Sequence, residues 1–221
     1  MTLNLKQWRP MVRAALLPAL GPGWTMLPSG YEVARAGDDW MLQSTSFNRA
    51  SGVEKATIVA FVQPLFLRRS SFILSWAKIS PKTFRAEDPD FAEKVVDWFT
   101  TAGAEFWRRW GTVEGFIERL DDRHFRDEPN RWFPNNADTA AYARGLPLLG
   151  RGDELDSIWP AAVEKIRGSK VNDIEPLRET WRAGGQPAVL DYLREIRQDT
   201  IDNLGVQDLF DLDPAVPRPP G

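Results

Sequence analysis

The chain has 221 residues, 43% of them hydrophobic, and a net charge of −3. This length suits one large domain or two small ones, and the hydrophobic share is enough for a packed core. The chain has no cysteine, which excludes disulfides, thiolate metal sites, iron–sulfur clusters and cysteine nucleophiles. No apolar run approaches the roughly 20 residues that span a bilayer, and the start of the chain lacks the pattern of a signal peptide. We therefore expect a cytoplasmic protein with no membrane partner.

Residues 3–20 have the spacing of an amphipathic helix. Its apolar positions recur at helical intervals: Leu5, Trp8, Val12, Ala15, Leu16 and Leu20. Pro10 has no amide proton, so the regular helix is expected to begin near Arg9. Gly21 and Gly23 flank a proline and end it.

Four strands are predicted next, at residues 31–36, 40–48, 57–67 and 72–79. Short polar turns separate them, which favours an antiparallel meander. The third strand is apolar on both faces, and this predicts cover on both sides of the sheet. Pro64 cannot donate a hydrogen bond to the ladder, so we expect a bulge or an edge position there.

The rest of the chain has helical periodicity. A helix is expected from residue 91, with its apolar residues in one stripe: Phe91, Val95, Trp98, Ala102, Phe106 and Trp110. A polar loop is predicted at 121–134. The other predicted helices lie at residues 112–120, 136–149 (capped by Asn136 or Asp138), 153–167, 173–183 and 187–204.

These elements predict an α+β fold, with an N-terminal helix and a four-stranded antiparallel meander followed by an all-helical part. We divide the chain into helix plus sheet at 1–86, helices packed on the sheet at 87–205, and a flexible proline-rich tail at 206–221. The first two parts could also form one continuous domain.

Positive charge is concentrated in the first part of the chain. Residues 1–85 hold 11 Lys and Arg against 4 Asp and Glu, whereas residues 86–221 hold 17 against 27. A basic half is typical of nucleic-acid binding. The basic residues are scattered, however, and this favours attraction between the two halves of the chain instead.

Few residues suggest catalysis. His124, the one histidine, could join Asp121 in a metal site or as a general base, but a solvated loop position explains it more simply. Ser75 and Lys78 have the Ser-x-x-Lys spacing of penicillin-binding enzymes, yet a strand would place them on opposite faces. The nucleophile-elbow and phosphate-cradle motifs are absent from the sequence. We therefore assign no catalytic residue, no metal ligand and no cofactor.

Arginine and aromatic side chains are the candidates for a binding surface, because both residue types are frequent in recognition sites. They occur after the third strand, at the end of the aromatic helix and in the polar loop: Arg68, Arg69, Trp107, Arg108, Arg109, Trp110, His124, Arg131 and Trp132. Arginines at a helix C-terminus also complement its dipole, and loop aromatics are equally often packed on the core.

Residues 62–66 read Val-Gln-Pro-Leu-Phe. Together with the order of elements over roughly residues 5–160, this strand resembles uncharacterised bacterial domain families in which a helix precedes an antiparallel meander and more helices follow. The resemblance implies a bacterial protein, and some such families look associated with immunity or defence.

Three functions follow as hypotheses. The first is a non-enzymatic protein-binding module whose partner is another protein. The second is a nucleic-acid-associated module that uses the basic N-terminal half. The third is a hydrolase built on carboxylates, for which acidic pairs such as Asp121 and Asp122 are available.

Overall fold

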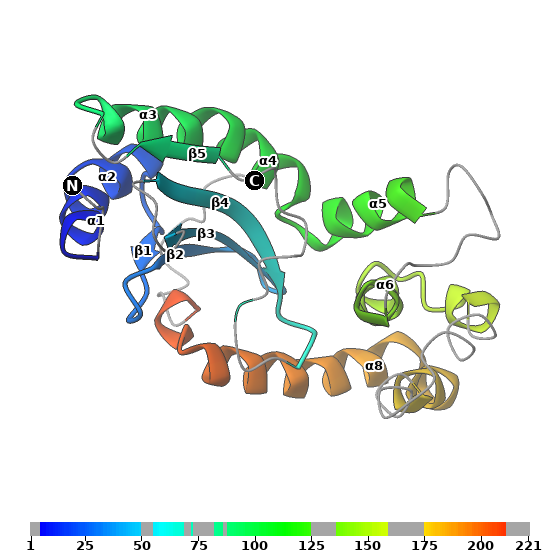
Figure 1. Ribbon diagram of the computed structural model, residues 1–221. Coiled ribbons are helices and arrows are strands. Elements are labelled where there is room, and N and C mark those ends of the chain that lie inside the picture. Colours follow the sequence, from blue (N-terminus) through cyan, green and yellow to red (C-terminus); the bar gives the residue numbers. More distant parts are fainter. Residues whose placement is uncertain are drawn as a thin grey trace. The chain divides into compact units, whose positions relative to one another are not determined.

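The structure is a computed structural model of the protein (Figure 1). It describes residues 5–49, 55–68, 72, 82–85, 88–124, 136–158 and 175–210. The chain forms two compact units, each built from separate stretches of sequence. Unit 1 comprises Met1–Gln63, Ser71–Thr112 and Gly205–Gly221, and unit 2 comprises Pro64–Ser70 and Val113–Leu204. The predicted boundary at residue 86 marks a change from strands to helices along the chain, and as a boundary between domains it stays a prediction.

Unit 1 contains a five-stranded antiparallel sheet in the order β1-β2-β3-β4-β5. The strands are β1 (Thr25–Met26), β2 (Glu32–Asp38), β3 (Met41–Arg49), β4 (Lys55–Pro64) and β5 (Lys82–Arg85). The predicted α+β class and the meander order are confirmed. The short outer strands β1 and β5 were not predicted, because two to four residues give too little alternation to detect.

The predicted strand at 72–79 lies outside the described residues except for Phe72, whose ring packs edge-on against Phe61 with centroids 5.9 Å apart. On the edge of β4 that faces away from β3, the described partner strand is β5, with Ala56 opposite Phe84. Every residue of β4 from position 58 to 63 is buried, which confirms the expected cover on both faces of this strand.

The N-terminal helix is continuous but not uniform. It consists of α1 (Leu5–Met11), a π-helical turn η1 (Val12–Leu16) and α2 (Leu17–Leu20). Pro10 lies inside α1, so the expectation that the helix begins near Arg9 was wrong. Trp8, Val12 and Leu16 are fully buried, and the Trp8 ring stacks on Phe47 of β3 at 4.7 Å. The helix is therefore anchored on the sheet.

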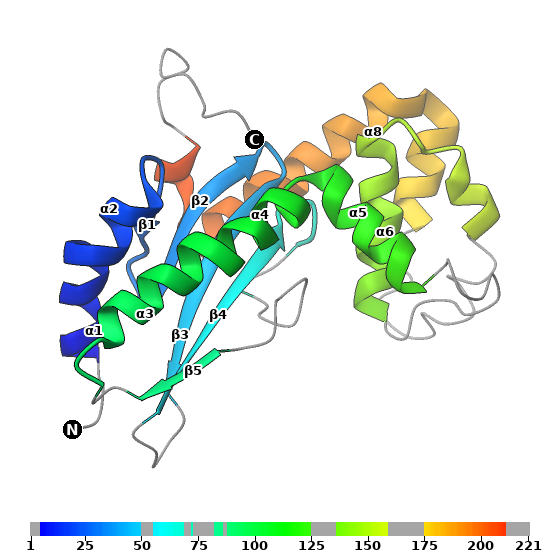
Figure 2. The same ribbon diagram turned by 90° about the horizontal axis from the view of Figure 1, so that it is seen from above.

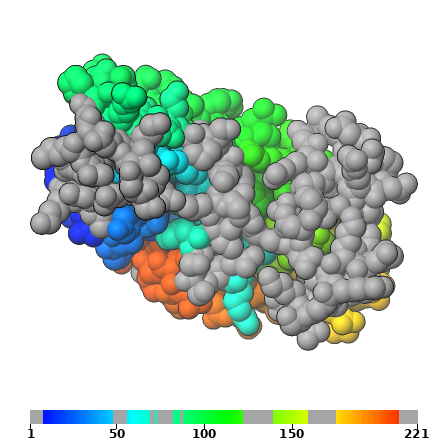
Figure 3. All heavy atoms as spheres, viewed as in Figure 1, coloured from blue at the N-terminus to red at the C-terminus, as the bar shows by residue number. Residues whose placement is uncertain are grey.

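The second helical segment of unit 1 runs across one face of the sheet (Figure 2). It comprises α3 (Phe91–Trp98), a second π-helical turn η2 (Phe99–Gly103) and α4 (Ala104–Trp110). Glu93 and Lys94 of this segment are exposed. The segment itself is seen in green along one edge of Figure 3.

The predicted stripe on this segment is right at Phe91, Val95 and Phe106, which are buried, but not at its other positions. Phe99, Gly103 and Trp107 are buried, whereas Trp98 and Trp110 are only partly buried and Ala102 is exposed. A π-helical turn holds more residues per turn than an α-helix, so it rotates the residues beyond it relative to an α-helical pattern. The hydroxyls of Thr100 and Thr101 accommodate this turn by donating to the carbonyl oxygens of Val96 and Asp97.

Unit 2 is helical. It contains α5 (Val113–His124), α6 (Asn136–Leu148), a helical stretch at residues 154–158, and α8 (Glu175–Leu204). Helix α8 breaks at Gly185, where φ is 62°, in agreement with the two helices predicted at 173–183 and 187–204. The predicted loop at 121–134 was wrong at its start, because α5 continues through His124.

The segment 64–70 belongs to unit 2 and is fixed there by three contacts. The rings of Phe66 and Phe116 meet edge-on at 6.4 Å. The buried Thr200 hydroxyl of α8 donates to the Leu67 carbonyl oxygen at 2.9 Å, and Arg68 forms an ion pair with Asp199 at 3.2 Å. The residues that follow β4 along the chain are thus integrated into the helical unit.

The end of the described chain returns to unit 1. A short 3-10 helix, η4 (Gln207–Leu209), follows α8, and both Val206 and Leu209 are buried. The first residues of the predicted tail are therefore packed, and residues 211–221 lie outside the described part of the chain.

Candidate binding site

Six of the nine predicted surface residues lie in the part of the chain that the structure describes. Arg69, Arg131 and Trp132 lie outside the described residues, and His124 is the last residue of α5. Arg68 belongs to unit 2, where Asp199 neutralises its charge.

The other four predicted residues follow one another on α4 in unit 1. Trp107 is buried and donates its indole Nε1–H to the Phe61 carbonyl oxygen at 3.2 Å. Arg108 pairs with Glu105 at 2.6 Å, and the Arg109 guanidinium lies over the Trp110 ring, 4.2 Å from its centroid. Local partners thus account for each of these side chains, and the Trp107 ring is part of the core.

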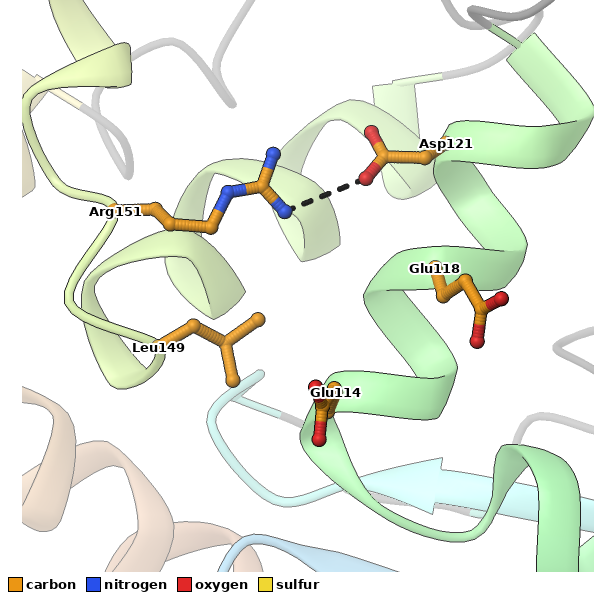
Figure 4. Close-up of a pocket in the computed structure, with 5 residues that line it drawn as sticks. All are labelled: Glu114, Glu118, Asp121, Leu149 and Arg151. Atoms are coloured by element: carbon orange, nitrogen blue, oxygen red, sulfur yellow. Dashed lines mark hydrogen bonds and ion pairs between the residues drawn. The ribbon is translucent and has the colours of Figure 1, made fainter.

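A pocket of about 430 Å³ in unit 2 brings together polar groups from two parts of the sequence. Its lining residues are Glu114, Glu118, Asp121, Leu149 and Arg151. Figure 4 shows the three acidic residues along α5, with Leu149 and Arg151 approaching from the opposite side and the Arg151 guanidinium directed at Asp121.

The three acids share one side of α5 because they are four and three residues apart, the spacing of neighbours on a helix surface. An adjoining side of α5 is apolar and packs in the core, with Ile117 fully buried. A Cβ on Gly145 of α6 would lie 2.3 Å from the Ile117 side chain, so a glycine is required for the two helices to approach this closely.

The position of Arg151 is set by the end of α6. Gly150 has a φ of 72°, its amide donates to the Pro147 carbonyl at 3.0 Å, and the Arg151 amide donates to the Leu146 carbonyl at 2.9 Å. This pair of bonds is a Schellman motif, in which glycine adopts the left-handed conformation at the first position beyond the helix. The turn fixes the residue after the glycine at the pocket.

Arg151 is the centre of a hydrogen-bonded cluster. It binds both oxygens of Glu154, at 2.7 and 2.9 Å, and contacts Asp121 at 3.3 Å. The partly buried Tyr142 hydroxyl donates to Asp121 at 2.6 Å. Burial, and then the bond to Asp121, raise the pKa of Tyr142, and the bond to Glu154 raises the pKa of Arg151. Tyrosine and arginine therefore keep their protons.

The pocket carries an excess of negative charge. Glu114, Glu118 and Asp121 line the pocket together with Arg151, and Glu154 binds the same guanidinium, which gives the five groups a formal charge of −3. Glu114 and Glu118 are exposed, and within the described residues neither forms an ion pair. Such an arrangement suits a cationic group, since the carboxylates can accept its hydrogen bonds.

A second hollow, of about 550 Å³, lies in unit 1 between β5 and α3. Its charges are mixed: Lys82 and Arg85 come from the strand, and Asp88, Lys94 and Asp97 from the helical side. Lys94 is already paired with Asp88 at 3.2 Å and with Asp90 at 3.0 Å. This hollow has no strong preference for either sign of charge.

The sequence interpretation missed most of the acidic pocket. It singled out Asp121, but not Glu114, Glu118 or Arg151. The spacing of the three acids on one side of a helix could have indicated the pocket. The sequence analysis predicts a loop from residue 121, so this spacing was not recognised.

Over the described residues, no group of three histidine or acidic side chains is placed to hold a metal ion. A search of the same part of the chain finds no helix with the length and hydropathy needed to cross a membrane. No protein-family model, curated protein or solved structure matches the chain at a significant level.

Proposed function

We propose that the protein is a non-enzymatic protein-binding module whose acidic pocket accepts a positively charged segment of another protein. The observation that carries this proposal is that Glu114 and Glu118, beside the Asp121–Arg151 cluster, form no ion pair with any residue that the structure describes. Two exposed carboxylates four residues apart on a helix, next to the apolar Leu149, complement a lysine or arginine side chain with its apolar stem.

The bonding within the cluster favours this function over a carboxylate-based hydrolase. A general acid and base must be free to exchange protons and need their pKa values moved toward the working pH. Asp121 accepts a hydrogen bond from Tyr142 on one oxygen and from Arg151 on the other, so both oxygens are engaged within the protein. Its oxygens therefore serve to hold the pocket in shape.

The charge of the two units favours a protein partner over a nucleic acid. Unit 1 holds 13 Lys and Arg and 13 Asp and Glu, and unit 2 holds 15 and 18. The excess of positive charge in residues 1–85 is thus balanced by the acidic residues that complete unit 1. Binding to the phosphate backbone requires a basic surface, and neither unit has a net positive charge.

The test begins with the native purification of the tagged chain and identification of any stoichiometric partner, followed by affinity measurements on the purified pair. We expect Glu114→Gln combined with Glu118→Gln to weaken binding roughly tenfold, because two exposed ion pairs contribute about 1–2 kcal/mol together. The control is Glu179→Gln combined with Glu195→Gln, which removes the same charge from exposed positions on α8.

A photo-crosslinker placed at Glu118 should capture a basic segment of the partner, whereas one at Glu195 should not. Equal affinity of the two double variants would contradict the proposal. So would recovery of the chain alone under every purification condition, or a salt-dependent shift of DNA or RNA in place of a protein complex. The resemblance at residues 62–66 favours a partner from an immunity or defence system, and a toxin gene beside the gene for this chain would support that role.

A further inference from the structure

Arg35 on β2 is a partly buried arginine in unit 1 with an unusual environment. It lies opposite Gln43 of β3 and donates from Nε to the Gln43 side-chain oxygen at 2.7 Å. Its guanidinium lies over the Trp24 ring, 5.1 Å from the centroid. The Trp24 ring is itself held against the buried Trp107 at 4.5 Å. These contacts fix the plane of the guanidinium.

The charge of Arg35 has no counterion in the described part of the chain. No carboxylate lies within ion-pair distance of it, and burial lowers the pKa of its guanidinium without any acidic neighbour to offset the effect. Two other partly buried arginines are paired with carboxylates, Arg151 with Glu154 and Arg178 with Asp156. A desolvated charge without a partner is costly, and such groups are enriched at binding sites.

The nearest structural explanation does not account for this charge. Cations often complement the C-terminal end of a helix, and α4 ends close by. However, the Trp107 carbonyl of α4 accepts from the Gly111 amide at 2.8 Å and from the Gln43 side chain at 3.5 Å, and Arg35 makes no bond to it. Gln43 thus stands between the arginine and the helix.

The local strand geometry also departs from a regular ladder. The pairing of β2 and β3 shifts register between Ala36 and Asp38, directly after Arg35. Bulges of this kind re-aim side chains and are frequent beside functional sites. Only the Nε–H of Arg35 is used within the protein, so the terminal N–H groups on its planar fork have no protein acceptor among the described residues.

We propose that Arg35 is the anion-recognising group of a second binding site, which takes a carboxylate or phosphate group of a small ligand. The terminal N–H groups of a guanidinium match the two oxygens of such a group, and a guanidinium already held by Gln43 and Trp24 loses little freedom on binding. This site lies in unit 1 and does not depend on the acidic pocket of unit 2.

The test measures the melting temperature and calorimetric binding of the full chain with inorganic phosphate or citrate, at constant ionic strength. We expect at least one of these anions to raise the melting temperature, and Arg35→Gln to weaken its binding roughly tenfold or more. Arg35→Lys should retain part of the effect, because it keeps the charge but loses the bidentate geometry. Arg13→Gln, at an exposed position of the same unit, is the control.

The melting temperature of Arg35→Gln in anion-free buffer distinguishes a ligand-binding role of Arg35 from a structural one. If Arg35 serves a ligand, Arg35→Gln should melt no lower than the parent protein in anion-free buffer, since it removes an uncompensated charge. Response to phosphate alone, or to citrate alone, would identify the ligand group. The proposal is overturned if neither anion binds, if Arg35→Gln binds as well as the parent, or if that variant is clearly less stable without anion.

Discussion

The indole of Trp107 on α4 donates its Nε1–H to the carbonyl oxygen of Phe61 on β4, at 3.2 Å in the buried core of unit 1. This bond joins a helix to the middle of a sheet across 46 residues of sequence. It also explains why a residue that looks suited to recognition is used for packing: the indole satisfies its one polar group within the core.

Replacing Trp107 with phenylalanine should therefore destabilise the protein by about 1–3 kcal/mol, since the Phe61 carbonyl oxygen would lose a buried donor. Trp110→Phe is the matched control, because that ring is only partly buried. Its cost should stay below about 1 kcal/mol. Chemical denaturation of the three proteins gives both values. Equal stability of the two variants would show that the bond to Phe61 contributes nothing.

Because of the π-helical turn η2, the helix should tolerate the deletion of one residue better than the insertion of one. Deleting Thr101 should convert Phe99–Gly103 to α-helix while Phe106 and Trp107 keep their buried positions, because the wider turn holds a surplus residue. Inserting an alanine after Thr101 should rotate both aromatic residues away from the sheet and cost several kcal/mol, of the order of a lost Phe or Trp side chain in a core.

Thermal melts and tryptophan fluorescence distinguish the two variants. The deletion should preserve a blue-shifted, buried tryptophan spectrum and a cooperative transition. An insertion that is tolerated as well as the deletion would mean that the register of α4 is not set by η2.

Tyr142 should make the stability of unit 2 sensitive to alkaline pH. Its pKa is raised above the ordinary value of 10.0 by burial and by its bond to Asp121, so the folded protein holds this proton more tightly than the unfolded chain. The resulting stabilisation is complete below about pH 10 and is lost as the pH rises toward the folded-state pKa. Tyr142→Phe should show a weaker loss of stability above pH 10.

Absorbance at 295 nm provides the measurement. The chain has three tyrosines, and one of them should resist ionisation until the protein unfolds. Tyr142→Phe should remove that late fraction, whereas Tyr31→Phe, a control at an exposed position, should leave it in place. Ionisation of all three at ordinary pH in the folded protein would contradict the raised pKa.

The Schellman motif at Gly150 should be a sensitive point of the acidic pocket. Gly150→Ala places a Cβ in the left-handed region and should cost about 1–2 kcal/mol, while Gly150→Asn should cost less, because asparagine tolerates that conformation. The same alanine variant should loosen Arg151 and reduce partner binding. Nuclear magnetic resonance of the arginine side-chain Nε–H groups would show whether Arg151 has lost its fixed environment.

The α+β class, the order of the middle strands and the break in α8 could be predicted from the sequence, because each depends on local information. Alternation marks the strands, and Gly184, Gly185 and Pro187 mark the break. The two π-helical turns could not be predicted in this way. The apolar spacing of both segments predicts an uninterrupted α-helix, and only at η2 does the buried side depart from the predicted stripe, between Trp98 and Phe106.

Less of the candidate site than of the fold could be predicted from the sequence, for a related reason. The acidic pocket depends on Arg151 reaching Asp121 across 30 residues, and its position comes from the turn at Gly150. Arg35 is similar, since its scattered neighbours Trp24 and Gln43 meet it only in the folded sheet. An individual arginine in the sequence gives no indication of whether a carboxylate will lie beside it.

The division of the chain into interleaved stretches has a consequence for synthesis. The chain contributes residues to unit 1 up to Gln63, again from Ser71 to Thr112, and finally from Gly205 onward. Unit 2 contains Pro64–Ser70 and is completed at Leu204. While the ribosome is still translating α8, unit 1 lacks its last stretch and unit 2 lacks part of its last helix, so neither unit is complete. Nascent chains of this protein are expected to depend on chaperones late in elongation, and a truncation after Leu204 would remove the last stretch of unit 1 while keeping every stretch of unit 2.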